Sequence, residues 1–278
     1  AVGLLGRNGA GKSSVLKALL GLVRPVAGRM RFADLPEGAP ASRVREHVGY
    51  MPERDAHLPQ ASGFDMVAML GRLSGLARRE AWRRAHEMLY LVGLDEQRYR
   101  PVSSYSAGMR QKVKLAAALV HDPRVLFLDE PTNGLDPAGR REMLELVRAL
   151  SRELGKSVVF STHILQDVEA VCDGAVVLER GRVVAQGALA ELTRGAPLRY
   201  RLKVEPPHVD ALSELQQFAT ATQRAAGEYE VALADAVDTT RLFAAVQRAG
   251  AAVRGLTPLR RTLEEVFLHA VGSSEGVR

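Results

Sequence analysis

A glycine-rich run that ends in a lysine and a serine stands near the start of the chain. Residues 6–13 read Gly-Arg-Asn-Gly-Ala-Gly-Lys-Ser, a full match to the pattern G-x-x-x-x-G-K-[ST]. The run follows an apolar stretch at residues 2–5 and precedes an amphipathic one at 12–22, so it is predicted to be a loop between a strand and a helix. Glycines let backbone N–H groups approach an anion, and the start of a helix adds positive potential. The pattern favours a phosphate-binding loop over an ordinary glycine-rich turn.

The side chains of this run suggest separate tasks. Lys12 is predicted to bring its charge to the terminal phosphates of a nucleotide, and the Ser13 hydroxyl to bind Mg²⁺. Ser14 is expected to donate to a phosphate nearer the sugar. The remaining phosphate contacts are expected from Gly6, Asn8, Gly9, Ala10 and Gly11. The run alone indicates a nucleotide and names no reaction.

Two adjacent carboxylates follow a second apolar stretch. Residues 125–130 read Val-Leu-Phe-Leu-Asp-Glu, and a buried strand that ends in acids places them at the sheet edge where ligands bind in open α/β folds. Asp129 is predicted to hold Mg²⁺ through water, and Glu130 to orient and polarise an attacking water. A solvated acidic turn is the alternative for this segment alone, and the phosphate loop argues against it.

Two further polar positions have weaker patterns. Ser106 precedes a helical stretch and suits a helix N-cap, where backbone N–H groups can either be capped only or also hold an anion. His163 closes an apolar stretch at residues 158–160, and a lone histidine at a strand end is usually structural. Because that strand is expected at the edge that carries Asp129, a contact between His163 and the γ-phosphate is also predicted.

Short apolar runs alternate with longer amphipathic ones, which predicts an α/β fold with a parallel or mixed sheet. Strands are predicted at 2–5, 48–51, 125–128, 158–160, 175–178 and 183–185, and helices at 12–22, 64–73, 78–92, 107–120, 140–154 and 165–171. The helix at 78–92 is expected to bury Trp82 with its other apolar residues. Residues 193–197 are predicted to be a linker, and 198–270 a small α+β domain. Its strands are expected at 198–204, 228–232 and 253–256, and its helices at 209–218, 240–249 and 263–270.

Composition narrows the class of protein. The chain has 278 residues, 46% of them hydrophobic, and a net charge of +6, with the arginines interspersed among acids as on solvated helices, so no nucleic-acid partner is expected. The single cysteine, Cys172, excludes an internal disulfide and a cysteine-rich zinc site. No run is long and apolar enough to span a bilayer and no signal peptide is evident, so the sequence predicts a soluble chain that would need a separate membrane subunit for any transmembrane process.

In this order and spacing the motifs resemble the nucleotide-binding domain of ABC transporters. The resemblance covers residues 1–192 and is specific, because Ser106-Ala107-Gly108 is similar to that family's signature motif. It implies a P-loop NTPase fold of the ABC ATPase type, with a helical signature subdomain at about 54–122 and the small C-terminal α+β domain. The segments at 48–53 and 105–109, and the tail at 263–267, are similar to the single-domain ATPases of bacterial exporters.

The resemblance also implies a mechanism and partners. Two copies would pack head to tail around ATP and Mg²⁺, with Lys12 of one copy facing Ser106, Ala107 and Gly108 of the other, and with Asp136 reaching across. Glu130, His163 and Lys12 would be the catalytic residues, and Ser13, Glu53 and Asp129 would bind the metal. The segment from 53 to about 75 would face a multi-spanning permease. The chain would then lie peripherally at the cytoplasmic face of the inner or plasma membrane and drive export.

Some positions depart from the family pattern. Glu53 stands where most members have glutamine, and Ala107 and Met109 replace the commoner glycine and glutamine of the signature. The chain opens inside its first predicted strand, so it is interpreted as N-terminally incomplete, and the adenine-stacking aromatic of the family falls upstream of Ala1. A soluble ABC-type ATPase that acts on ribosomes or DNA is the alternative, although no heptads interrupt the region between Lys12 and Asp129. A catalytically silent subunit is a third interpretation, and the complete set of motif residues argues against it.

Overall fold

The computed structural model describes residues 1–32, 35–36, 38–55, 57–193, 198–207, 210–233 and 239–259. The chain divides into two compact units, Ala1–Leu189 and Ala190–Arg278. Most of the predicted linker and the predicted helix at 263–270 lie outside the described residues. The domain limits predicted at 192 and 198 therefore stay a prediction.

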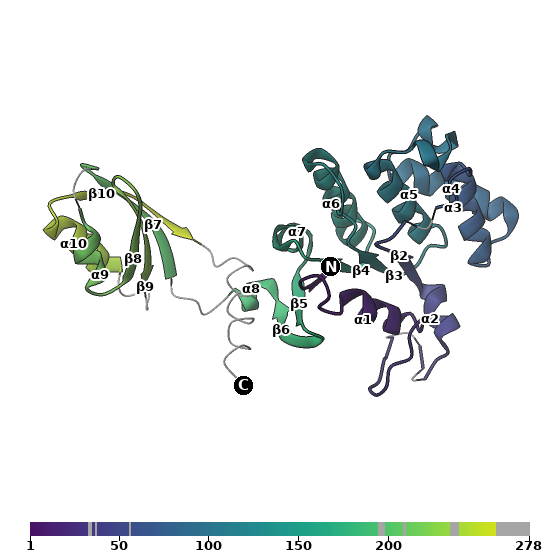
Figure 1. Cartoon of the computed structure of the whole chain (residues 1–278), viewed down its shortest axis with the longest axis horizontal. Helices are drawn as coiled ribbons and strands as arrows, with labels where there is room; N and C mark the ends of the chain where they lie inside the picture. The colour runs from purple at the N-terminus through teal and green to yellow at the C-terminus, as the bar shows by residue number, and fades with distance from the viewer. Residues whose placement is uncertain are drawn as a thin grey trace. The chain divides into compact units, whose positions relative to one another are not determined.

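A six-stranded sheet forms the centre of the first unit, in the order β2-β3-β4-β1-β5-β6 (Figure 1). Its strands are β1 Val2–Leu5, β2 Val48–Met51, β3 Val125–Asp129, β4 Ser157–Thr162, β5 Gly174–Glu179 and β6 Arg182–Ala188. All neighbouring pairs are parallel except β5 and β6, which form a hairpin. In the register, Asp129 of β3 pairs with Ser161 of β4, and Leu5 of β1 with Thr162. The carboxyl ends of β1, β3 and β4 therefore meet at one edge.

Helices cover both faces of this sheet. Along the chain the helices are α1 Lys12–Leu19, α2 Ala41–His47, α3 Gly63–Leu73, α4 Arg78–Leu91, α5 Ala107–Leu119, α6 Pro137–Arg152 and α7 Leu165–Val171, and the short α8 Leu189–Leu192 follows β6. Helices α3 and α4 pack on each other and on α5. Side chains on β1 alternate between the faces. A Cβ at Gly3 would lie 2.5 Å from Val168 of α7, whereas Leu4 belongs to the buried cluster that includes Leu16 of α1. Figure 1 accordingly shows α6 and α7 on one side of the sheet and α1 on the other.

The element types predicted for the first unit are confirmed, with corrections at their limits. The first helix ends at Leu19 and not at 22, because Gly21 takes a left-handed φ of 67° and its N–H donates to Ala18 O. Helix α6 begins at Pro137, since Asp136 caps it by accepting from Gly139 N at 2.9 Å. Helix α2 was not predicted. Trp82, expected in the core, is 46% exposed.

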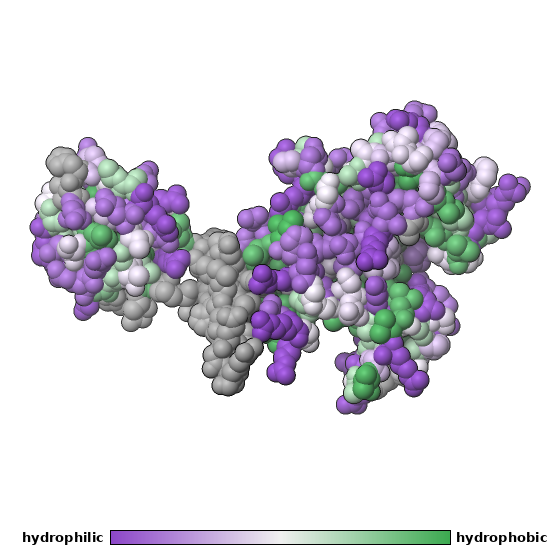
Figure 2. Space-filling view, viewed as in Figure 1, coloured by the Kyte–Doolittle hydropathy of each residue, from purple (hydrophilic) through white to green (hydrophobic). Residues whose placement is uncertain are grey.

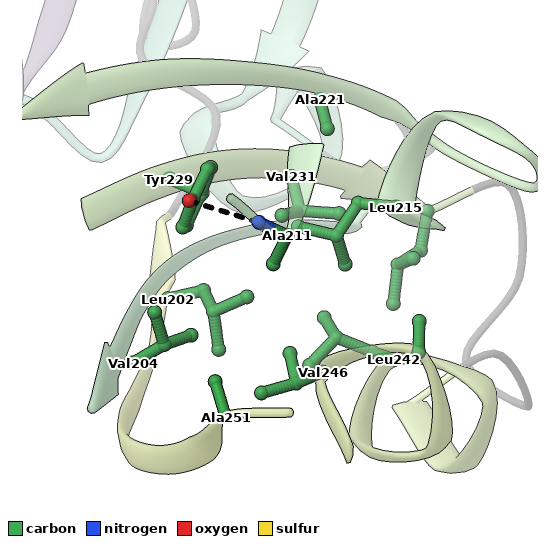
Figure 3. Packing of buried hydrophobic residues seen from close by; sticks show 12 residues of the cluster. Leu202, Val204, Ala211, Leu215, Ala221, Tyr229, Val231, Leu242, Val246 and Ala251 are labelled. Atoms are coloured by element: carbon green, nitrogen blue, oxygen red, sulfur yellow. Dashed lines mark hydrogen bonds between the residues drawn. The ribbon is translucent and has the colours of Figure 1, made fainter. Parts of the chain in front are cut away.

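The second unit carries a four-stranded antiparallel sheet in the order β10-β7-β9-β8. Its elements are β7 Leu198–Glu205, α9 Leu212–Gln216, β8 Thr220–Ala225, β9 Glu228–Leu233, α10 Thr239–Arg248 and β10 Ala252–Leu259. Strand β8 was not predicted, and the helix predicted at 209–218 is shorter. Alternate residues of β7 and β9 pack against α10 through Leu202, Val231 and Leu242 (Figure 3). The buried Tyr229 hydroxyl accepts from Ala211 N at 3.1 Å (Figure 3).

The visible surface is mostly hydrophilic, and on the face shown in Figure 2 the hydrophobic residues form separate patches. Within the described part of the chain, no helix has both the length and the apolar character that crossing a membrane requires.

Candidate functional site

The loop between β1 and α1 has the backbone shape that an anion site needs. Gly9 and Gly11 have φ angles of 83° and 104°, a region that other residues rarely adopt. A Cβ at Gly6 would lie 2.6 Å from Leu178 O, so no side chain fits there. Helix α1 begins at Lys12, directly after Gly11. The positive end of α1 therefore faces the space that the loop encloses.

Lys12 is held at the base of this loop. Its side chain is 6% exposed, and its Nζ donates to Gly6 O at 2.7 Å. The same Nζ lies 3.2 Å from Glu130 Oε1, in an ion pair between two buried side chains. The pair joins the glycine-rich loop to the end of β3. Because these contacts already order the Lys12 side chain, it loses little further rotamer entropy when an anion binds.

The two acids at the end of β3 have different surroundings. Asp129, 1% exposed, accepts from Ser161 Oγ at 2.5 Å. Glu130 takes an unusual φ of 49°, and its N–H donates to Ser161 O at 3.0 Å. This turn sends its side chain back to Lys12 on one oxygen and to His163 Nδ1, 3.0 Å from Oε2, on the other. His163 is 42% exposed and thus reaches Glu130 from the solvent side.

Tyr50 of β2 lies near Asp129 and Glu53, and their charges affect its pKa. Burial, followed by the charges of Asp129 and Glu53, raises the pKa of Tyr50 to about 12. The phenol is therefore neutral at any physiological pH and adds no charge to a group of carboxylates.

A cavity of about 390 Å³ opens over the loop. Residues of the loop and of α1 line it together with Glu53 and Glu130: Arg7, Asn8, Gly9, Gly11, Lys12, Ser13 and Ser14. The structure thus gathers most of the predicted phosphate and metal residues in one place. Of the others, Gly6, Ala10 and Asp129 are buried, and His163 contacts Glu130 without lining the cavity.

The remaining predicted residues line a different cavity of about 420 Å³. Ser106, Ala107 and Gly108 at the start of α5 face Asp136 at the start of α6 across it. Ser106 Oγ caps α5 by accepting from Met109 N at 3.3 Å. The two cavities share no lining residue. Within one chain, the residues predicted to surround a nucleotide therefore line two separate cavities.

Comparison with known proteins places this architecture. A sequence profile described as "ABC transporter" matches residues 1–133. The ABC transporter ATP-binding protein YxlF of Bacillus subtilis (strain 168) is 34% identical over 97% of this chain and 90% of its own length. The chain belongs to the ABC transporter family. This ABC ATPase is also 35% identical to the Nod factor export ATP-binding protein I of Burkholderia orbicola (strain AU 1054), over 97% of the chain and 87% of that protein.

The solved structures agree with this assignment. The ATP-binding cassette MJ0796, solved as a dimer in a post-hydrolysis state bound to ADP and Pi, superposes with a TM-score of 0.60 and 25% identity. The match covers 68% of this chain and 84% of that one. The predicted fold, a P-loop NTPase of the ABC ATPase type, and the ATPase activity of the family are thereby confirmed.

The donor set of the ABC ATPase fits Mg²⁺ that arrives with a nucleotide. The hydroxyl of Ser13 and the carboxylates of Glu53 and Asp129 are hard oxygen ligands. Among the described residues, no three His, Cys, Asp or Glu side chains cluster as a self-sufficient metal site. Mg²⁺ commonly keeps several waters and takes one or two protein ligands beside phosphate oxygens. The residues present fit Mg²⁺ that is held partly by phosphate and water, and they do not form a site made of protein ligands alone.

Two buried contacts near the site were missed by the sequence analysis. Asp167 of α7, fully buried, accepts from Thr132 Oγ1 and from Arg140 Nε, each at 2.7 Å. Lys114 of α5, 4% exposed, donates to Pro52 O and Glu53 O. Charged residues on amphipathic helices usually face solvent, so no sequence signal distinguished these two.

Proposed function

We propose that this ABC ATPase drives export through a separate membrane permease, and that it hydrolyses ATP only as a head-to-tail dimer. The observation that carries the dimer is the division of the predicted site into two cavities with no residue in common. Each cavity offers one type of anion contact, a glycine-rich loop in one and a capped helix start in the other. A second copy brings the missing half to each nucleotide, as the dimeric cassette to which this chain is similar supports.

Each catalytic role follows from a contact of the chain. Lys12 and the backbone N–H groups of the loop bind the terminal phosphates, because the ammonium and the helix start face the same cavity. Glu130 acts as the base that orients the attacking water, and its unusual backbone turn points its carboxylate at the cavity. His163 contacts Glu130 through its Nδ1, and we propose that its partly exposed ring also contacts the γ-phosphate of a bound nucleotide.

Ser13, Glu53 and Asp129 would hold Mg²⁺, with Asp129 acting through water because it is buried behind the cavity wall. When bound, Mg²⁺ neutralises charge that develops on the phosphate oxygens. Ser161 fixes the Asp129 carboxylate for this task by donating to its Oδ1. The residues of this chain thereby orient the ligands before any nucleotide arrives.

Export through a permease rests on relatives. The protein from Burkholderia orbicola is named for Nod factor export, and none of the relatives described above is named for ribosomes or DNA. A peripheral place at the cytoplasmic face of the membrane follows from a permease partner. The segment from 53 to about 75 is its proposed contact, and it includes the exposed Leu58, Met69 and Leu73.

A dimerisation experiment tests the central claim. We expect Glu130→Gln to bind ATP and to elute as a dimer with ATP and as a monomer without it, measured by light scattering after gel filtration. Adding Ser106→Arg should abolish the dimer while each monomer keeps ATP affinity, because Ser106 does not line the cavity of its own loop. Ser103→Arg, at an exposed position outside both cavities, is the matched control. A dimer that survives Ser106→Arg would refute the shared site.

A further inference from the structure

The segment after β2 brings Glu53 to the nucleotide cavity, yet little of its own structure fixes it. Residues 52–55 form neither helix nor strand, and Glu53 itself is exposed. Glu53 can serve a metal or a water only if its backbone is held still, since small displacements of catalytic groups are costly. The contacts that hold this segment therefore decide how Glu53 is placed.

Lys114 supplies those contacts from the middle of α5. Its Nζ donates to Pro52 O at 3.0 Å and to Glu53 O at 2.9 Å, and lies 3.3 Å from Asp55 Oδ1. The three protons of one ammonium are thus matched by three acceptors from a single stretch of four residues. Arg110, one turn earlier on the same helix, binds the other oxygen of Asp55 at 3.1 Å through Nε. Helix α5 therefore holds the segment through two backbone carbonyls and the Asp55 carboxylate.

Helix α5 packs tightly on the strand that precedes this segment. Helix α5 lies close on β2, because a Cβ at Gly49 would come within 2.0 Å of Ala118 O. Lys114 is 4% exposed, so its charge has little access to water. Burial lowers the pKa of Lys114, and the Asp55 carboxylate opposes that shift. A buried ammonium is costly and, as a source of stability alone, an apolar side chain would serve as well.

The start of the same helix lines the second cavity. Ser106 caps α5, and Ser106, Ala107 and Gly108 face the space assigned above to the nucleotide of the partner copy. Lys114 therefore connects the helix that starts at the second cavity to the backbone of Glu53 at the first. We propose that Lys114 is a positioning residue, which sets Glu53 in one nucleotide site according to where α5 sits in the other.

This inference rests on the proposed role of Glu53 at the nucleotide. A lysine that merely filled a buried position would affect folding and activity without regard to Glu53. A lysine that acts through Glu53 has no effect on turnover once Glu53 is gone. Epistasis between the two residues separates the two roles.

The experiment measures ATP hydrolysis by the full chain. Lys114→Met keeps the aliphatic stem and should lower kcat by about 10- to 100-fold, with KM for ATP changed less than about threefold because the phosphate loop is untouched. In the Glu53→Ala background the same substitution should lower kcat less than about twofold further. Lys114→Arg, which can still donate to both carbonyls, should restore most of the turnover.

Arg84→Met is the matched control. Arg84 of α4 also donates to two successive carbonyls, Val120 O at 3.2 Å and Leu119 O at 3.4 Å, away from either cavity. It should lower the melting temperature and leave kcat unchanged. Asp55→Asn weakens the ion pairs that hold the same segment to Lys114 and Arg110, and Asp55 is half-exposed. This variant takes the place of Lys114→Met if Lys114→Met does not fold.

The outcomes are distinct. An unchanged kcat in Lys114→Met, or an equal fall with and without Glu53, overturns the positioning role and leaves the ATPase site as proposed. If Glu53→Ala hydrolyses ATP as fast as the wild type, Glu53 has no role in the site and this inference is wrong. The absence of any hydrolysis by the wild-type dimer would refute the proposed function itself.

Discussion

Asp167→Asn removes one negative charge from a fully buried position and leaves the shape of the side chain almost unchanged. In the wild type its two oxygens accept from Thr132 Oγ1 and Arg140 Nε, each at 2.7 Å. A hydrogen bond to a charged group contributes about 1.5–3 kcal/mol, against about 0.5–1.5 kcal/mol for a neutral one. The substitution therefore costs roughly 1 kcal/mol or slightly more for each bond.

Solvent exposure reduces the free-energy loss from one of these two hydrogen bonds. The Arg140 side chain is 30% exposed, so water compensates part of its loss, whereas Thr132 is 3% exposed and has no such help. We expect a net loss of about 2 kcal/mol in the free energy of unfolding of the first unit. For a domain of this size that lowers the melting temperature by about 4–8 °C. Calorimetry of the full chain resolves such a shift.

Asp122→Asn provides the matched control, because Asp122 also pairs with two cations, Lys156 at 2.6 Å and Arg84 at 3.5 Å. Its side chain is 69% exposed, and asparagine tolerates its left-handed φ of 57°. The expected loss is below about 1 kcal/mol. Equal shifts in the two variants, or none in Asp167→Asn, would refute the argument from burial.

Three other predictions concern the site and the single thiol. Glu130→Gln should slow phosphate release at least about 100-fold with ATP binding retained, and wild-type turnover would remove Glu130 as the base. Lys12→Ala should weaken binding of a fluorescent ATP analogue at least about tenfold; unchanged affinity would exclude Lys12 from the phosphates. Burial raises the pKa of Cys172 to about 12. The buried neutral thiol therefore stabilises the folded chain fully below the ordinary thiol pKa, and this contribution is lost as the pH rises towards 12. Alkylation at pH 8 should therefore be at least about 100-fold slower in the folded than in the urea-unfolded chain, and equal rates would contradict this.

The sequence was informative where one short segment determines its own conformation. The glycine-rich loop was predictable because Gly9 and Gly11 must take positive φ angles there, and the acids after β3 because an apolar strand led into them. The turn between the predicted strands at 175–178 and 183–185 also depends on local residues, with Arg180 and Gly181 at φ angles of 48° and 77°. Such features need no knowledge of distant residues.

Elements whose formation depends on partners were not predictable. Strand β8 is almost wholly exposed apart from Ala221, so its sequence lacks a clear alternation, and pairing with β9 decides its conformation. Trp82 followed the helical period of the core and still lies at the surface, where its ring forms a T-shaped pair with Phe64 and lies under the guanidinium of Arg78. Periodicity identified the helix and missed which part of its apolar face is covered.

Periodicity likewise could not show that Lys114 and Asp167 are buried, and the ion pairs of both residues involve a helix that starts at the second cavity. Helix α5 starts at the second cavity with Ser106, and its Lys114 binds the segment of Glu53 in the first. Helix α6 starts there with Asp136, and its Arg140 binds Asp167 in the helix that follows His163. Each wall of the second cavity thus has an ion pair with one buried partner, and these pairs lead to the segment of Glu53 and to the helix that follows His163. Because a buried charge adds little stability over an apolar side chain of similar volume, the burial of Lys114 between the two cavities supports the positioning role proposed for it.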